Sequence, residues 1–207
     1  LRRPAHARSD RPPLTRSRVA ERLAEALAPV IVISATALFV ALPTATSLVT
    51  GIGWAALAVL FNVVIPEARN WLGTWRDEHE GETGVRVHRR RPITFGLAPM
   101  VVGLGLLLVL GAPRELVALS VALLGVLHAV AAIRRRWRWR PSVHTAVAAG
   151  CVTALIAVFG PALMLAYLAP VAVGWARVVQ GERSGAETVG GAFLGIAVTT
   201  PAYLLIA

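Results

Sequence analysis

Long apolar runs constrain this chain more than any other feature. Residues 93–111 read ITFGLAPMVVGLGLLLVLG without a charged side chain, and comparable runs recur along the sequence. A helix of roughly 18 or more apolar residues is long enough to cross the hydrocarbon core of a bilayer. Hydrophobic residues make up 56% of the chain and charged residues only 15%, too few to cover a soluble domain of this size. The sequence therefore predicts an all-α, polytopic transmembrane helix bundle.

A polar segment precedes the first apolar run. Residues 1–18 are rich in Arg, Pro and Ser, so we expect them to be disordered. Val19, Leu23 and Leu27 follow at helical spacing with arginines beside them, which is typical of an amphipathic helix on a membrane surface. Residues 1–27 are thus predicted to form a basic tail and a juxtamembrane helix.

The remainder, residues 28–207, is predicted to be the transmembrane domain with six to seven spans. The spans are expected near residues 28–50, 53–72, 93–111, 114–133, 142–160, 161–179 and 188–207. Pro43 and Pro170 fall inside two of them. Proline removes a backbone hydrogen bond, so both spans should be kinked at these positions.

The arginines are distributed unevenly between the two sides of the predicted bundle. The short turns at 50–53, 111–115 and 159–162 hold a single arginine, Arg114. Nearly all other basic residues, every one an arginine, lie in the N-terminal tail and in segments 73–92, 134–141 and 180–187. An excess of basic residues marks the cytoplasmic side. We therefore expect a multi-pass protein of the cell membrane with a cytoplasmic N-terminus.

The net charge of +10 is carried by arginines that flank apolar runs. This placement favours anionic membrane lipids, and not nucleic acid, as partners. Because the spans between them come in pairs, segments 73–92, 134–141 and 180–187 should return to one face. Guanidinium groups bind phosphate oxygens in pairs, and a helix N-terminus offers free N–H donors. Arg140, Ser142 and His144 at the start of a span therefore indicate an anion site. The alternatives are arginines that only set topology and a histidine that only caps a helix.

The same residues carry a resemblance to a known family. Pro141-Ser142-Val143-His144 resembles the PSGH motif of the type 2 phosphatidic acid phosphatase and haloperoxidase superfamily, with valine in place of glycine. The spacing of Arg177, Arg183 and Glu187 matches the family motif SRxxxxxHxxxD. Arg91-Pro92 is what remains of the motif KxxxxxxRP. The chain is similar to a divergent bacterial member with degenerate motifs.

The resemblance implies a membrane hydrolase in which His144 is catalytic and protonates the leaving oxygen. The residues expected to bind the phosphate are Arg91, Arg140, Ser142, Arg177 and Arg183. Arg183 stands where the family has its nucleophilic histidine, and without that imidazole no phosphohistidine intermediate can form at this position. Replacement nucleophiles on the same face are His79 and His88. No resident cofactor is expected, although Mg²⁺ is conceivable on the acidic cluster Asp77, Glu78, Glu80 and Glu82.

Two functions follow from these residues. The leading expectation is an integral membrane phosphatase that hydrolyses a lipid phosphate or a prenyl (di)phosphate at the cytoplasmic face. The alternative is a catalytically inactive family member that binds anionic lipid headgroups or acts as a membrane scaffold. Ser142, His144 and Arg177 favour the enzyme, whereas Arg183 favours the inactive protein.

Overall fold

A computed structural model describes residues 14–68, 72, 97–137 and 139–207 of this chain. All regular secondary structure in these residues is helical. The elements are α1 (Leu14–Ala26), α2 (Pro29–Thr44), α3 (Leu48–Val59), the π-helical η1 (Leu60–Val64), α5 (Leu97–Val109), α6 (Arg114–Arg136), α7 (Val143–Phe159), the 3₁₀-helical η4 (Pro161–Tyr167), α8 (Leu168–Val179) and α9 (Gly185–Ile206).

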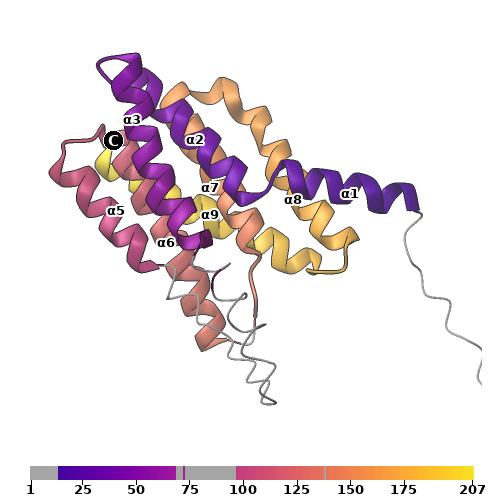
Figure 1. Cartoon of the computed structure of the whole chain (residues 1–207). Helices are drawn as coiled ribbons and strands as arrows, with labels where there is room; N and C mark the ends of the chain where they lie inside the picture. The colour runs from indigo at the N-terminus through magenta and orange to yellow at the C-terminus, as the bar shows by residue number, and fades with distance from the viewer. Residues whose placement is uncertain (1–13, 69–71, 73–96, 138) are drawn as a thin grey trace, which may run out of the picture.

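The helices from α2 to α9 run back and forth between two ends of the bundle (Figure 1). The turn between α2 and α3, the turn between α5 and α6, Gly160 and the C-terminus lie toward one end, which we call the turn end. The last turn of α6, residues 139–142 and the turn 180–184 lie toward the other, which we call the arginine end.

Four helical stretches are long and apolar enough to cross a membrane, among the residues that the structure describes. They are Leu48–Ala68, Arg114–Arg136, Pro161–Val179 and Gly185–Ile206. A fifth crossing results if Ser17–Ala26 and Pro29–Thr44, which are bent by 40° at their junction, count as one span. The chain is therefore an all-helical protein with the features of a membrane protein, but six to seven spans are not confirmed.

Three predicted spans correspond to shorter helices. Residues 28–50 give only the 16 residues of α2, which ends one residue after Pro43. Residues 142–160 give the 17 residues of α7, which stops at Gly160 with φ of +89°. Within 93–111 the structure describes α5, a helix of 13 residues. Pro170 does not kink a continuous α-helix, because it lies in the first turn of α8, directly after the 3₁₀ segment η4.

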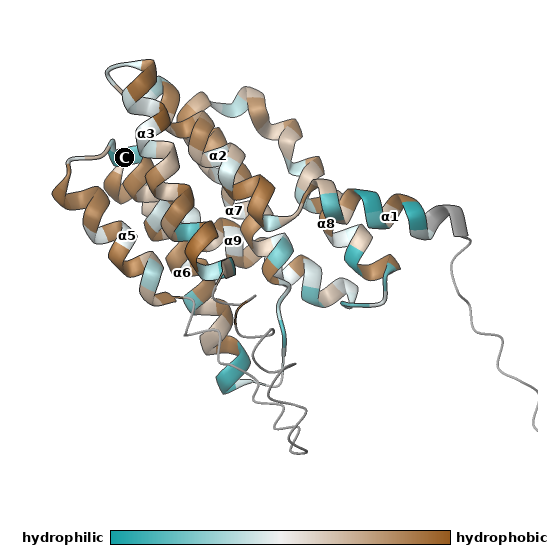
Figure 2. Ribbon diagram, viewed as in Figure 1, coloured by the Kyte–Doolittle hydropathy of each residue, from teal (hydrophilic) through white to brown (hydrophobic). Residues whose placement is uncertain are grey.

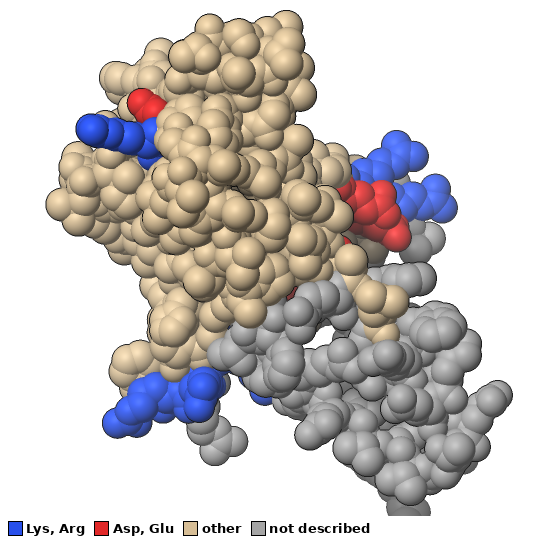
Figure 3. Space-filling view, turned by 60° about the vertical axis from the view of Figure 1, so that its left-hand side comes forward, with Lys and Arg blue, Asp and Glu red and all other residues tan. Residues whose placement is uncertain are grey.

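The outer surface of the bundle is mostly apolar. Hydrophobic ribbon dominates the helices between the two ends, and hydrophilic residues gather on α1 and at the arginine end (Figure 2). The space-filling view shows charged side chains at the margins of a broad uncharged surface (Figure 3). Large side chains such as Val109 (84% exposed) and Leu165 (79% exposed) point outward. An exposed apolar surface of this kind is stable only against another apolar phase, here the lipid.

Small residues let α7 and α9 approach each other closely. Gly191, Gly195 and Thr199 recur every four residues on α9, which places them on one face of the helix. A side-chain carbon at Gly195 would overlap the carbonyl group of Ala146, and one at Gly191 would lie 2.5 Å from the Ser142 carbonyl oxygen. Such small-residue faces are the usual means of packing helices in a membrane, where there is no hydrophobic driving force between them. The contact fixes the start of α7 beside α9.

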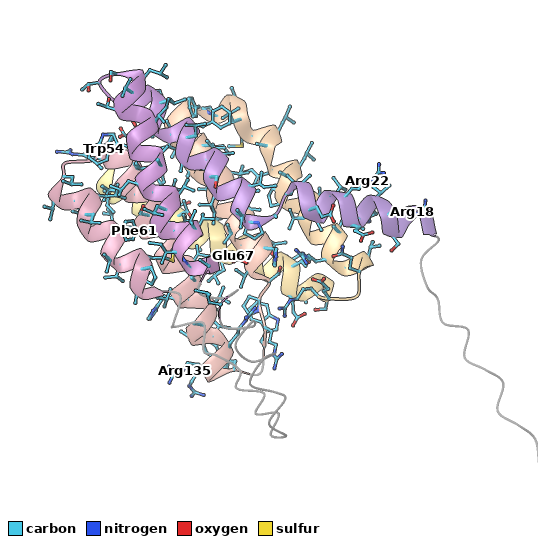
Figure 4. All side chains as sticks on the ribbon, in the orientation of Figure 1. Arg18, Arg22, Trp54, Phe61, Glu67 and Arg135 are labelled. Atoms are coloured by element: carbon cyan, nitrogen blue, oxygen red, sulfur yellow. The ribbon has the colours of Figure 1, made fainter. Side chains whose placement is uncertain are left out.

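The N-terminal helix α1 packs against α8. Ala20 of α1 is fully buried, whereas Val19, which the sequence placed on the apolar stripe, is 51% exposed. Arg18 and Arg22 point away from the bundle (Figure 4). Residues 1–13 of the predicted basic tail lie outside the described residues.

Candidate functional site

Two arginine-bearing segments meet at the arginine end. The backbone N–H of Ser142 donates to the carbonyl oxygen of Glu187 at 2.9 Å, and Nη1 of Arg183 donates to the carbonyl oxygen of Arg140 at 3.5 Å. Gly190 leaves the space that the Trp139 indole fills. Segments 139–142 and 180–190 therefore form one structure, as the sequence predicted. Segment 73–92, the third expected partner, lies outside the described residues together with Arg91, His79, His88 and the acidic cluster.

Ser142 starts α7. Its side chain is only 1% exposed, and its Oγ accepts a hydrogen bond from the backbone N–H of Thr145 at 3.5 Å. The Thr145 hydroxyl in turn donates to the Ser142 carbonyl oxygen at 3.2 Å. This is the arrangement of a helix N-cap, which satisfies an otherwise unpaired donor of the first turn. The phosphate-binding role of Ser142 stays a prediction.

His144 lies in the first turn of α7, at the arginine end of a helix that is not among the four long spans. Its side chain is partly buried close to the arginines of the α8–α9 turn. Burial, and secondarily the positive charge of Arg177, lowers the pKa of His144 from 6.5 to about 4. Both causes disfavour the imidazolium form. His144 is therefore neutral at pH 7, with Arg177, Glu182 and Arg183 as its charged neighbours.

Arg177 occupies the last turn of α8. Its side chain is 15% exposed, and Nη1 lies 2.5 Å from Oε2 of Glu182, whose side chain is 51% exposed. The Nε–H of Arg177 is buried and has no acceptor among the described residues. One strong hydrogen bond therefore leaves part of the guanidinium donor capacity unused.

Arg183 and Glu187 occupy the positions that the family motif gives to histidine and aspartate. Nη1 of Arg183 lies 3.9 Å from Oε1 of Glu187. The other carboxylate oxygen of Glu187 accepts from the backbone N–H of Ser184 at 3.0 Å, and Oγ of Ser184 accepts from the N–H of Glu187. This capping box begins α9 and places Glu187 beside Arg183. The Arg183 guanidinium has only N–H donors and cannot take the nucleophilic role of the family's histidine.

Arg134 belongs to the same group of side chains, although the sequence analysis did not include it in the site. Its Nη2 donates to the carbonyl oxygen of Pro141 at 3.2 Å, and its buried Nε–H has no acceptor among the described residues. Arg134 follows the fully buried Val130 by four residues, so it lies on the inner face of α6, whereas Arg135 and Arg136 are exposed. The four-residue spacing from a buried valine is the sequence feature that distinguishes Arg134 from the exposed arginines next to it.

We call Arg134, Arg140, Arg177 and Arg183 the arginine cluster. Arg183 contacts the Arg140 backbone and lies near His144, so it links the segment before α7 to the start of that helix. Only two carboxylates, Glu182 and Glu187, pair with the cluster in the described residues. The excess of positive charge and the unused Nε–H donors make this region suited to an anion.

No protein-family model, curated protein or solved structure matches this chain. The likeness to the phosphatase superfamily consequently rests on the residues of this sequence alone. Of the residues it singles out, Arg140, Ser142, His144, Arg177 and Arg183 come together at the arginine end.

Proposed function

We propose that the arginine cluster binds the phosphate group of a membrane lipid, a lipid phosphate or prenyl phosphate, at the cytoplasmic face. Guanidinium groups are the preferred protein ligands of phosphate because their paired N–H donors match its oxygens. The cluster draws its members from three separate parts of the chain: α6, the segment before α7, and the end of α8 with the turn that follows it. Three anchoring segments give such a cluster a defined shape, which a basic loop alone lacks.

The observation that carries the proposal is the pair of unused donors. Arg134 and Arg177 each keep a buried Nε–H without an acceptor in the part of the chain that the structure describes. Buried donors are almost always paired in proteins, and an unpaired one costs about 1–3 kcal/mol. A phosphate oxygen that reached either Nε–H would supply the missing acceptor.

The position of the cluster supports a lipid as the source of the phosphate. It lies at one end of the apolar bundle, where Trp137 and Trp139 are 60% and 41% exposed. Exposed tryptophans at the end of a membrane helix are typical of the headgroup level. A phosphate bound here would keep its hydrocarbon chain beside the outer surface of the helices.

Binding of a short-chain phosphatidic acid to the detergent-solubilised protein, followed by calorimetry, tests the proposal. Hydrogen bonds to charged groups contribute about 1.5–3 kcal/mol, so Arg177→Gln and Arg134→Gln should each weaken binding about 10- to 100-fold. Arg114→Gln is the matched control, because Arg114 begins the helix whose last turn holds Arg134 but lies at the turn end. Equal loss in all three variants, or no binding by the wild type, would refute the proposal.

Hydrolysis of the bound phosphate is the second candidate function. It is favoured by His144, which stands beside Arg177 and Arg183 in its neutral form. A phosphate dianion in the cluster would raise the pKa of His144 and let it serve as general acid for the leaving oxygen. The nucleophile would come from His79, His88 or a water activated by a metal on the acidic cluster, all outside the described residues.

Release of phosphate from lipid phosphates, measured with and without Mg²⁺, decides between binding and hydrolysis. If the protein is an enzyme, His144→Ala should lower turnover about 10²- to 10⁴-fold. Activity that survives this substitution would remove His144 from the catalytic role. Binding without any phosphate release would identify the non-catalytic lipid-binding protein.

A further inference from the structure

Arg177, at the end of α8, forms an ion pair with Glu182 in the turn that follows the helix. Glu182 follows Arg177 by five residues, and the contact of 2.5 Å joins the mostly buried Nη1 of Arg177 to the half-exposed carboxylate of Glu182. The Arg177 side chain is thus the more buried member of the pair, and the Glu182 carboxylate is the more exposed one. Arg177 is one of the arginines expected to bind an anion, and Glu182 already occupies it.

The backbone of the α8–α9 turn brings Glu182 into this position. Gly181 has φ of +72°, a conformation that glycine adopts without strain. The N–H groups of Glu182 and Arg183 then donate to the carbonyl oxygen of Arg177 at 3.1 and 3.3 Å. These bonds close the C-terminus of α8 without any help from the Glu182 side chain. The carboxylate can therefore leave Arg177 while the turn keeps its hydrogen bonds.

The Arg177–Glu182 pair does not use the guanidinium group fully. Arg177 retains the buried Nε–H without an acceptor in the described residues. Glu182 can exchange this pair for water, because its side chain is 51% exposed and solvent screens the charge of an exposed carboxylate. A phosphate offers more acceptor oxygens than a single carboxylate contact does.

We propose that Glu182 is an intramolecular competitor for the phosphate: it occupies Arg177 while the cluster is empty and moves to solvent when a phosphate binds. This inference rests on the proposed phosphate-binding function of the arginine cluster. The competing carboxylate lowers the apparent affinity for every phosphate ligand, because each ligand must displace it first. At low ligand concentration it keeps Arg177 paired.

The test compares Glu182→Gln with the wild type, using dioctanoyl phosphatidic acid and, in a parallel series, inorganic phosphate. Glutamine keeps the size of the side chain and removes its charge, so affinity for both probes should rise about 2- to 5-fold. Glu182→Asp keeps the charge on a shorter side chain and should give an intermediate affinity. Glu115→Gln makes the same change of charge at the turn end and should leave the affinity unchanged. The ratio of the two probes shows whether the cluster prefers a lipid headgroup or free phosphate.

A merely structural role for Glu182 gives different results. If the ion pair only supports the turn, Glu182→Gln lowers both the melting temperature and the affinity, and the inference is overturned. Loss of binding in Arg177→Gln would still support the proposed function in that case. Absence of phosphate binding in the wild type and in Glu182→Gln overturns both. Tighter binding by Glu182→Gln at an unchanged melting temperature supports both.

Discussion

Burial keeps His144 neutral in the folded protein, and this makes the stability of the protein depend on pH. Its pKa falls from 6.5 to about 4 in the folded protein, first through burial and then through Arg177. Between these two pH values the unfolded chain binds a proton at this position and the folded chain does not. Stability therefore falls as the pH drops from about 6.5 to about 4.

We predict that His144→Gln flattens this part of the stability curve. Melting temperatures of the wild type should drop between pH 7 and pH 4, and those of the variant should drop less, because glutamine does not titrate. All other groups are the same in both proteins, so their contributions cancel in the comparison. Parallel curves for the two proteins would show that His144 is not held in its neutral form by the fold.

The sequence indicated most of the residues at the arginine end, but it did not indicate the contacts that they make. Arg140, His144, Arg177 and Arg183 were expected at one face from arginine asymmetry and motif spacing, and they lie together. Glu182 was not expected to hold Arg177, because an ion pair of this kind depends on the conformation of the turn at Gly181. The place of Arg134 in the cluster depends on which face of α6 is buried, and this face is known only from the structure.

The pairing of α7 with α9 positions the start of α7 beside the arginine cluster. The four-residue spacing of Gly191, Gly195 and Thr199 can be read from the sequence, but the helix against which this face packs cannot. Lengths of the helices were harder to predict. Hydropathy marks where apolar residues occur, whereas α2 and α7 end where a proline or a glycine with positive φ interrupts the backbone.

We predict that Gly195→Ala destabilises the protein by about 1–3 kcal/mol, since the added methyl group overlaps the backbone of α7 at Ala146. Gly105→Ala in α5 is the control, because a side-chain carbon there meets no atom within 4 Å. Alanine is the better helix former, so this control should be neutral or more stable by up to about 1 kcal/mol. Unfolding of the purified protein in detergent measures both, and similar effects of the two substitutions would contradict the close packing.

Most charged side chains of the described residues lie at the arginine end and on α1, whereas the turn end carries Arg114 and Glu115, and an apolar bundle lies between the two ends (Figures 2 and 3). From the arginine bias we expect the arginine end to face the cytoplasm. We predict that a cysteine introduced at Ala186 reacts with a membrane-impermeant maleimide only after permeabilisation, whereas one at Thr46 reacts in intact cells. Both positions are exposed, and the native Cys151 is fully buried. Labelling of both positions from the same side would contradict the arrangement of the crossings, and the reverse pattern would contradict the cytoplasmic site.

The most direct measurement is an experimental structure of the full chain with dioctanoyl phosphatidic acid. The account predicts a phosphate within hydrogen-bonding distance of Arg177 and Arg183, with Arg134 or Arg140 as a further ligand and the Glu182 carboxylate turned to solvent. Arg177 still paired with Glu182, and the phosphate bound away from the arginine cluster, would contradict it.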